Sequence, residues 1–283
     1  MSHRPRKRFG QNFLHDPVII HKIINAIRPT RSDALLEIGP GQGAITCPLL
    51  EAVGRLTVVE LDRDLIGPLQ ARCRSLGELT VHSADALSFD YCAVAGEQRL
   101  RVIGNLPYNI STPLLFHLLD QHRCIRDMHF MLQKEVVERM AASPGSGQYG
   151  RLSVMLQQRC RVTPLFTIGA GAFKPPPKVE SAFVRLEPYA RPVMHVSNQA
   201  AFETLVRQAF SQRRKTLRNT LRNLLGTEDI AMLGIDPSAR AESLGIEEFA
   251  ALANRLHEIR LQERRIRRDN RAGDGSPTSP RKP

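Results

Sequence analysis

The sequence predicts an α/β protein, in which helices cover both faces of a mostly parallel sheet, followed by a small all-helical region. Between Ala34 and about Phe130, short apolar runs alternate with helical patterns, as in parallel sheets joined by crossover helices. The 283 residues are enough for one large core and a small second one. After residue 193 the apolar residues recur at helical spacing.

The expected strands recur along the chain before the helical region. Buried parallel strands are predicted over residues 34–38, 56–60, 79–83, 100–104 and 128–132. Two further strands, expected to be antiparallel, are predicted over residues 152–162 and 181–186. Between these two, Phe173–Lys178 carries three consecutive prolines, which argue against a helix or an inner strand.

Composition divides the chain into four segments. They are a basic arm at 1–15 that contains the stretch QNFL, an α/β domain at 16–188, a small helical domain at 193–260, and a basic tail at 261–283. We expect the tail to be disordered from about Asp269, because it is rich first in Arg and then in Gly, Ser and Pro. The α/β domain opens with Asp16 as a helix N-cap and Pro17 as the first helical residue, and this helix stops before Pro29.

Charge and cysteine content bound the functional classes. The chain has 40 Lys and Arg against 28 Asp and Glu, a net charge of +12 and a pI of about 10.1, which favours a polyanionic partner, nucleic acid before an acidic membrane. The five cysteines show no CxxC or metal-ligand spacing, so we expect reduced thiols in a cytoplasmic protein without a metal. No apolar run approaches the ~20 residues of a membrane span. The basic N-terminus lacks the apolar region of a signal peptide.

A glycine-rich turn lies between the first predicted parallel strand and the helix after it. Gly39, Gly41 and Gly43 alternate with other residues in LLEIGPGQGAIT, residues 35–46. Glycines allow positive φ and remove Cβ, so a ligand can lie against the backbone, and the helix N-terminus offers free N–H groups. The spacing differs from the dinucleotide fingerprint GxGxxG, because Ala44 takes the third glycine position. Alone, the turn fits either a ligand-binding loop or the packing of a helix on a strand.

Carboxylates mark the ends of the next two strands. Glu60 ends the strand at 56–60, and Asp85 follows the strand at 79–83. In open α/β sheets, ligands bind outside the carboxyl ends of the strands. Glu60 can accept hydrogen bonds from both hydroxyls of a ribose, and Asp85 can accept one from the exocyclic amine of adenine. Either acid can instead cap a helix or lie in a solvated loop, but with the glycine turn they indicate an adenosine-containing cofactor.

The fourth parallel strand ends in the tetrapeptide Asn105-Leu106-Pro107-Tyr108. A nucleobase amine is a poor nucleophile, because its lone pair is delocalised into the ring. The Asn105 amide oxygen and a backbone carbonyl near Leu106 can each accept an N–H, which favours a tetrahedral nitrogen with a directed lone pair. Pro107 fixes the backbone, and Tyr108 offers a ring for a base to stack on. The alternative is a turn with a capping asparagine.

A run of basic residues follows the domain boundary. No acid occurs between residues 207 and 222, and Leu217, Leu221 and Leu224 recur at helical spacing. We expect an amphipathic helix whose cationic face contacts nucleic-acid phosphates, the alternative being a solvated face. The candidate RNA-binding residues are Arg207, Arg214, Lys215, Arg218 and Arg222.

The chain resembles the bacterial small-subunit (16S) ribosomal RNA adenine dimethyltransferases, the KsgA/RsmA family. The resemblance runs from Arg8 to about Glu258 and rests on KRFGQNFL at 7–14, EIGPGQGAIT at 37–46, VVELDRDL at 58–65, SADAL at 83–87, NLPYNISTPLLF at 105–116 and FKPPPKVESAF at 173–183. It implies a Rossmann-like methyltransferase domain that uses S-adenosyl-L-methionine. It also implies dimethylation of the N6 amines of two adjacent adenosines near the 3′ end of small-subunit rRNA, coupled to small-subunit biogenesis.

The resemblance also implies which residues hold the cofactor. They are Asn12, Leu14, Gly39, Gly41, Glu60, Asp85, Ala86 and Asn105. Asn12 and Leu14 are expected near the methionine part, and Gly39 in the loop beneath it. Glu60 is expected to hold the ribose and Asp85 the adenine amine.

The catalytic residues implied by the resemblance surround the target amine. They are Asn105, Leu106, Pro107, Tyr108 and Phe173. Phe173 is expected to stack on the flipped target base opposite Tyr108, the alternative being that it packs under its loop as a small satellite core. The implied partner is small-subunit rRNA or the assembling 30S subunit, contacted by a monomer without a membrane or a metal.

Three other functions are compatible with parts of the sequence. A resistance-type methyltransferase acting on large-subunit rRNA shares much of the pattern, although NLPYNISTPLLF and FKPPPKVESA are closer to the small-subunit enzymes. A DNA N6-adenine methyltransferase can use an Asn-x-Pro-aromatic motif, but more often carries a sizeable target-recognition domain. A non-enzymatic assembly factor predicts losses at Asn105 or in the glycine turn, and both are intact.

Overall fold

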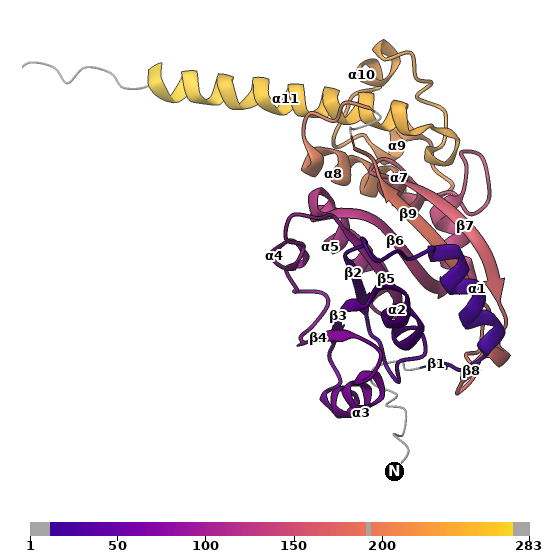
Figure 1. The fold of residues 1–283 in the computed structure, drawn as a ribbon. Coiled ribbons are helices and arrows are strands. Elements are labelled where there is room, and N and C mark those ends of the chain that lie inside the picture. Colours follow the sequence, from indigo (N-terminus) through magenta and orange to yellow (C-terminus); the bar gives the residue numbers. More distant parts are fainter. Residues whose placement is uncertain (1–11, 191–193, 274–283) are drawn as a thin grey trace, which may run out of the picture. The chain divides into compact units, whose positions relative to one another are not determined.

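The computed structural model describes residues 12–190 and 194–273, with side chains up to residue 267 (Figure 1). These residues form two compact units. The first consists of residues 12–141 and 159–190, and the second of residues 142–158 and 194–273. The segment 142–158 is expected in the α/β domain, but it groups with the helical residues instead.

A seven-stranded sheet forms the centre of the first unit. In spatial order its strands are β4 (Glu78–Ser83), β3 (Arg55–Glu60), β2 (Leu35–Ile38), β5 (Leu100–Asn105), β6 (Ile125–Gln133), β9 (Ser181–Pro188) and β7 (Cys160–Ile168). The strands from β4 to β6 are parallel, and β9 and β7 are antiparallel to their neighbours. The expected α/β class with antiparallel last strands is therefore confirmed. A separate pair joins β1 (Phe13–Leu14) to β8 (Phe173–Lys174).

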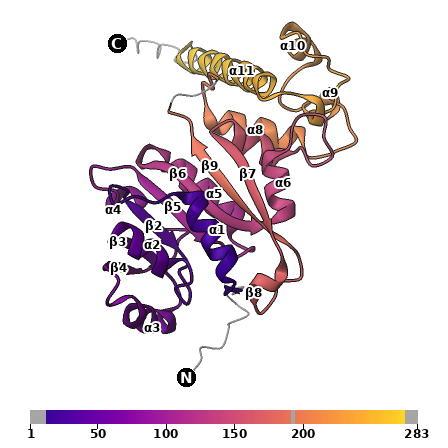
Figure 2. The ribbon, with the colours of Figure 1, turned by 45° about the vertical axis from the view of Figure 1, so that its right-hand side comes forward.

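Helices connect the strands of the first unit. They are α1 (Pro17–Ile27), α2 (Thr46–Val53), α3 (Arg63–Cys73), α4 (Tyr91–Val94), α5 (Ser111–Asp120) and α6 (Lys134–Ala141), with short 3-10 turns η2 (His122–Cys124) and η3 (Ala170–Ala172). Helix α6 lies alongside β7 at the antiparallel end of the sheet (Figure 2). As the sequence predicts, Asp16 caps α1 by accepting from the N–H groups of Val18 and Ile19, and Pro17 is the first helical residue.

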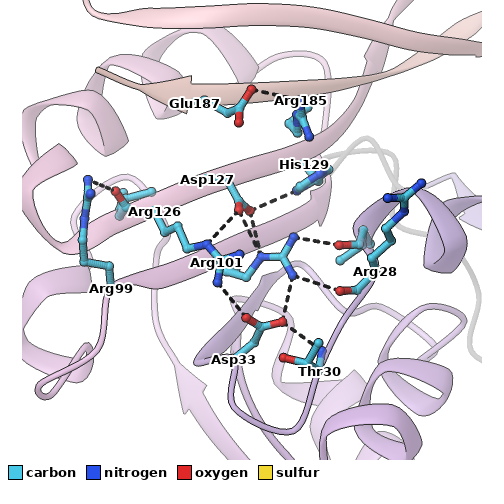
Figure 3. Close-up of polar contacts among 12 residues, drawn as sticks. Arg28, Thr30, Asp33, Arg99, Arg101, Arg126, Asp127, His129, Arg185 and Glu187 are labelled. Carbon is cyan, nitrogen blue, oxygen red and sulfur yellow. Dashed lines mark hydrogen bonds and ion pairs between the residues drawn. The ribbon is translucent and has the colours of Figure 1, made fainter. Parts of the chain in front are cut away.

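A buried polar network fixes the end of α1 to the start of β5 (Figure 3). The Arg101 guanidinium, 5% exposed, donates to Asp127 at 3.1 Å, to Asp33 at 2.8 Å and to the Ile27 carbonyl at 2.7 Å. Burial opposes ionisation of Asp33, but hydrogen bonds from Thr30 and Arg101 outweigh it and lower the pKa of this carboxyl. Losing Asp33 or Asp127 would weaken the compensation of a buried charge, and breaking a buried pair of this kind costs about 3–5 kcal/mol.

The second unit is helical. It contains α7 (Arg151–Gln157), α8 (Gln199–Ala209), α9 (Leu217–Thr220), α10 (Thr227–Met232), η4 (Ala241–Ser243) and α11 (Ile246–Gly273). Helix α7 corrects the strand expected over 152–162, since β7 begins only at Cys160. Every residue from Leu152 to Leu156 is buried, and a fully buried apolar run shows neither the strand nor the helix period.

Two other expectations for the second unit are wrong. The basic run 207–222 is not one helix, because α8 ends at Ala209 and the chain turns before α9 begins at Leu217. Disorder in the tail is expected from about Asp269, but α11 continues to Gly273; residues 274–283 lie outside the described part.

Cysteine chemistry also differs from the expectation of reduced thiols. Cys92 in α4 and Cys124 in η2 form a disulfide, while Cys47, Cys73 and Cys160 are free. Cysteine spacing does not predict this pair, because the two residues meet only when α4 packs beside η2. Within the described residues, no helix has the length and apolar character needed to cross a membrane.

Candidate active site

A cavity of about 360 Å³ opens at the carboxyl ends of the central parallel strands. Its lining comes from the glycine turn after β2, the end of β3, residues 84–87 after β4, residues 105–110 after β5, and residues 12–14. The groups that follow three of the parallel strands are expected to form one site, because the carboxyl ends of parallel strands share one edge of the sheet. In the structure these strand ends, together with the N-terminal segment, surround one space.

The glycine turn has the backbone that the sequence predicts. Gly39 and Gly41 have φ of 66° and 55°, values that L side chains rarely adopt. A Cβ added at Gly39 meets no atom within 4 Å, and one added at Gly41 meets the Phe13 ring at 3.1 Å. The turn therefore presents bare backbone to the cavity, and Phe13 covers part of it.

Glu60 is oriented by backbone hydrogen bonds. Its Oε1 accepts from the Asp62 N–H at 2.8 Å and its Oε2 from the Gly41 N–H at 3.2 Å. Burial raises the pKa of this carboxyl, and these backbone N–H groups partly offset the rise. Because each oxygen has further acceptor capacity, the carboxylate fits a pair of ribose hydroxyls in the cavity.

The wall beyond β4 is formed by Asp85 and Ala86. Asp85 Oδ1 accepts from the Leu87 N–H at 2.9 Å, and the Ala86 carbonyl accepts from the buried Tyr91 hydroxyl at 2.9 Å. The Asp85 carboxylate is exposed and retains acceptor capacity. Such a wall suits the exocyclic amine of an adenine ring.

Glu37 is a cavity residue to which the sequence assigns no role. It lies in β2, is 2% exposed, and its Oε2 has no hydrogen-bond partner within the described residues. Burial, with a smaller contribution from the Glu60 charge, raises the pKa of Glu37 to about 8, although Thr46 acts in the opposite direction. A carboxyl group in an otherwise apolar buried strand, just before a glycine turn, is the signal that could have identified it.

Asn105 is held by the N-terminal segment. Its Nδ2 donates to the Asn12 carbonyl at 2.9 Å, which leaves Oδ1 as the acceptor of this amide. The Leu106 N–H donates to the Met131 carbonyl of β6 at 3.2 Å, so the backbone beside Asn105 is also anchored. Asn105 Oδ1 is therefore an available acceptor on a residue that lines the cavity, and binding an amine requires such an acceptor.

Tyr108 lines the same cavity and is anchored at its hydroxyl. Its Oη lies 2.9 Å from Ser181 Oγ, and Ser181, the first residue of β9, is 1% exposed. The Tyr108 carbonyl accepts from the Ser111 hydroxyl at 3.1 Å, at the start of α5. The ring is thus fixed from two different elements.

Most of the predicted site residues line this one cavity. They are Asn12, Leu14, Gly39, Gly41, Glu60, Asp85, Ala86, Asn105, Leu106, Pro107 and Tyr108. The RNA-binding candidates Arg207, Arg214, Lys215, Arg218 and Arg222 are all exposed and belong to the second unit.

Phe173 is the one predicted catalytic residue that does not line this cavity in the structure, and its stacking role stays a prediction. The resemblance implies a ring that stacks on the target base, but the side chain is 3% exposed and does not line the cavity. It belongs to the core cluster that includes Leu14, Ile168 and Phe183. The physical reason is the β1–β8 pairing, in which Phe173 is the partner of Leu14.

Comparisons with known proteins identify the family of this chain. Residues 2–258 match the family model described as ribosomal RNA adenine dimethylase. A relative from Pseudomonas aeruginosa, named ribosomal RNA small subunit methyltransferase A, is 56% identical over 91% of this chain and 97% of that protein. A relative of the same name from Nitrosococcus oceani is 55% identical over 89% of this chain and 96% of its own.

Solved structures give the same fold. A dimethyladenosine transferase from Plasmodium falciparum has a TM-score of 0.72 and 28% identity, covering 85% of this chain and 95% of that one. The 23S rRNA methyltransferase ErmE has a TM-score of 0.69 and 24% identity, over 87% and 100% of the two chains, which is a likeness of fold alone. From the family match and the identity to these relatives, the chain belongs to the ribosomal RNA adenine dimethylase family.

Proposed function

We propose that this protein uses S-adenosylmethionine to convert two adjacent adenosines near the 3′ end of small-subunit rRNA to N6,N6-dimethyladenosine. It acts as a monomer on the assembling 30S subunit. The observation that carries the proposal is the Asn105 amide at the cavity: its Nδ2 donates to the Asn12 carbonyl at 2.9 Å, which leaves its oxygen as the acceptor for the target amine. The shared name of the relatives supports the small-subunit substrate.

The cavity residues fit an adenosine-containing methyl donor. Glu60 holds the ribose hydroxyls with a carboxylate already oriented by two N–H groups, and Asp85 accepts from the adenine amine. Open space beside Gly39 allows the ligand to lie against the backbone, as a Cβ there would otherwise project into it. When bound, the cofactor supplies a methyl group already activated by its sulfonium centre.

Asn105 and the Leu106 backbone orient the target amine. Asn105 Oδ1 and the Leu106 carbonyl accept the two N–H bonds of an adenine N6, which turns the nitrogen lone pair toward the methyl group. Alignment of this kind lowers the barrier by about 7–11 kcal/mol. The chain needs no strong general base, because the attacking N6 becomes acidic as the N–C bond forms and the C–S bond breaks, and it then releases its proton readily to solvent.

Tyr108 provides the surface against which the target base stacks. The hydrogen bond between its hydroxyl and the buried Ser181 holds the ring in place near Asn105. Stacking of a base on an aromatic ring contributes about 1–3 kcal/mol. The exposed basic residues of the second unit, such as Arg214 and Arg218, contact rRNA phosphates and supply affinity without sequence information.

Methyl transfer to defined substrates tests the proposal. Purified protein and radiolabelled S-adenosylmethionine are incubated with undermethylated small subunits, large subunits or DNA, followed by nucleoside analysis. The expected product is N6,N6-dimethyladenosine in small-subunit rRNA, and Asn105→Ala is the matched inactive control. Label found only in large-subunit rRNA would support the resistance-type alternative, and label found only in DNA the DNA-modifying one.

A further inference from the structure

Helix α11 is exposed from Leu261 to its last described side chain, whereas its N-terminal half packs against the rest of the second unit. Phe249, Leu252, Ala253 and Leu256 are buried, and they form one face of the helix. That face lies against α8, which runs antiparallel to α11: the Phe210 and Phe249 rings are 5.6 Å apart, and the Ser197 N–H reaches Asn254 Oδ1 at 2.8 Å. From Leu261 to the last described side chain at residue 267, every residue is exposed. The helix therefore continues beyond its packing partner (Figures 1 and 2).

The packed face continues as a stripe of arginines. Arg260, Arg264 and Arg267 follow Leu256 at helical spacing, and all three lie within about 80° of it around the helix axis at about 3.6 residues per turn. Over this stretch the rise of the helix is about 10 Å. The same face thus changes from apolar to cationic at the point where the helix leaves the body of the unit.

These arginines carry charge that the described residues do not neutralise. Arg264 and Arg267 have no ion pair within the described part of the chain, and neither does Arg260. Glu263 is the single acid between residues 260 and 267. By contrast, Arg255 on the packed half is paired with Asp229 at 2.8 Å. Arg260, Arg264 and Arg267 all lie after residue 258, where the match to the family model ends.

We propose that the segment Arg260–Arg267, here called the α11 arm, binds phosphates of ribosomal RNA and extends the RNA contact of this protein beyond the residues that the family model matches. Arginine presents forked N–H donors that match phosphate oxygens, and three of them along one helix face can follow neighbouring phosphates of one RNA segment. RNA bound to these arginines would lie along the same face of α11 that α8 covers on the packed half. The inference rests on the proposed rRNA substrate.

Salt-dependent binding of purified, undermethylated small subunits tests the α11 arm in the full-length protein. Replacing Arg260, Arg264 and Arg267 together with Gln, which is also a good helix former, removes the charge but not the helix propensity. The expected result is a log–log salt slope lower by about 2–3 and an affinity lower by on the order of 100-fold at about 0.1 M salt. The triple Lys variant is the matched control and should keep most of the slope. Arg265→Gln, on a different face, should change it by less than Arg264→Gln.

Three outcomes contradict the proposal. They are an unchanged slope in the triple Gln variant, an equal loss in the triple Lys variant, and loss of binding to anionic vesicles without any change in subunit binding. The assay contains no cofactor and needs no turnover. If the wild-type protein does not bind small subunits at all, the proposed function is contradicted. If it binds tightly and the triple Gln variant binds equally well, only the proposed role of the α11 arm is contradicted.

Discussion

Replacing Phe173 distinguishes a core role from a catalytic one. The ring is 3% exposed and packs in the same cluster as Leu14, Ile168 and Phe183. Phe173→Ala therefore removes a buried aromatic ring, which costs about 3–5 kcal/mol in a core that cannot fully collapse. We take the lower end, because Phe173 lies on a two-residue strand that can shift inward.

The expected readout is a large fall in melting temperature. For a chain of this size, 1 kcal/mol corresponds to about 2–4 °C, so a loss of about 3 kcal/mol predicts a melting temperature lower by about 10 °C. Melting curves are recorded beside single-turnover methylation of small subunits at a temperature where both proteins are folded. Phe173→Leu is the control, because it keeps most of the apolar volume but has no ring.

The two roles differ in what happens to the leucine variant. A core role predicts that Phe173→Leu melts within a few degrees of wild type and methylates at a similar rate. A stacking role predicts normal melting and a strong loss of methylation in both variants. Normal melting of Phe173→Ala would therefore rule out the core role that its burial indicates.

Four further predictions concern the cavity and its supports. Asn105→Ala should lower the single-turnover rate by about 10²–10³ with an unchanged melting curve, because it removes an acceptor used in the transition state; a rate within a few-fold of wild type contradicts its role. Glu60→Ala should weaken S-adenosylmethionine and S-adenosylhomocysteine equally in calorimetry, since both carry the ribose, and unchanged affinities would make Glu60 a structural cap. Ser181→Ala and Tyr108→Phe should each slow turnover, because each removes the same 2.9 Å hydrogen bond. The double variant should then be no slower than the slower single variant, whereas additive effects would mean that the two side chains act independently. The raised pKa of Glu37, about 8, means that the folded state binds the Glu37 proton more tightly than the unfolded state does. The free energy of unfolding of the wild type, relative to that of Glu37→Gln, should therefore be highest below about pH 4.5 and fall as the pH rises to 8. A difference between the two proteins that stays constant across this pH range would contradict the shift.

The packing partners of a side chain often come from distant parts of the chain, and the sequence does not predict these partners well. The sequence context of Phe173 fits either a stacking ring or a small core under its loop, and the pairing of β8 with β1 places the side chain in the core. The same pairing places the segment whose Asn12 carbonyl holds Asn105, a contact between residues far apart in the sequence. Helix α7 reads as a strand in the sequence because burial on all sides removes the period that distinguishes the two.

The class of the fold and most of the cofactor cavity, by contrast, can be predicted from the amino-acid sequence alone. Asp16 and Pro17 fix the start of α1 through local capping, and the alternation of apolar runs with helical patterns specifies parallel strands. The glycine turn, Glu60 and Asp85 can be assigned to one site, because carboxyl ends of neighbouring parallel strands must share one edge. Side-chain period and capping are local properties that a sequence displays directly, whereas burial and long-range partners arise only when distant segments are packed together.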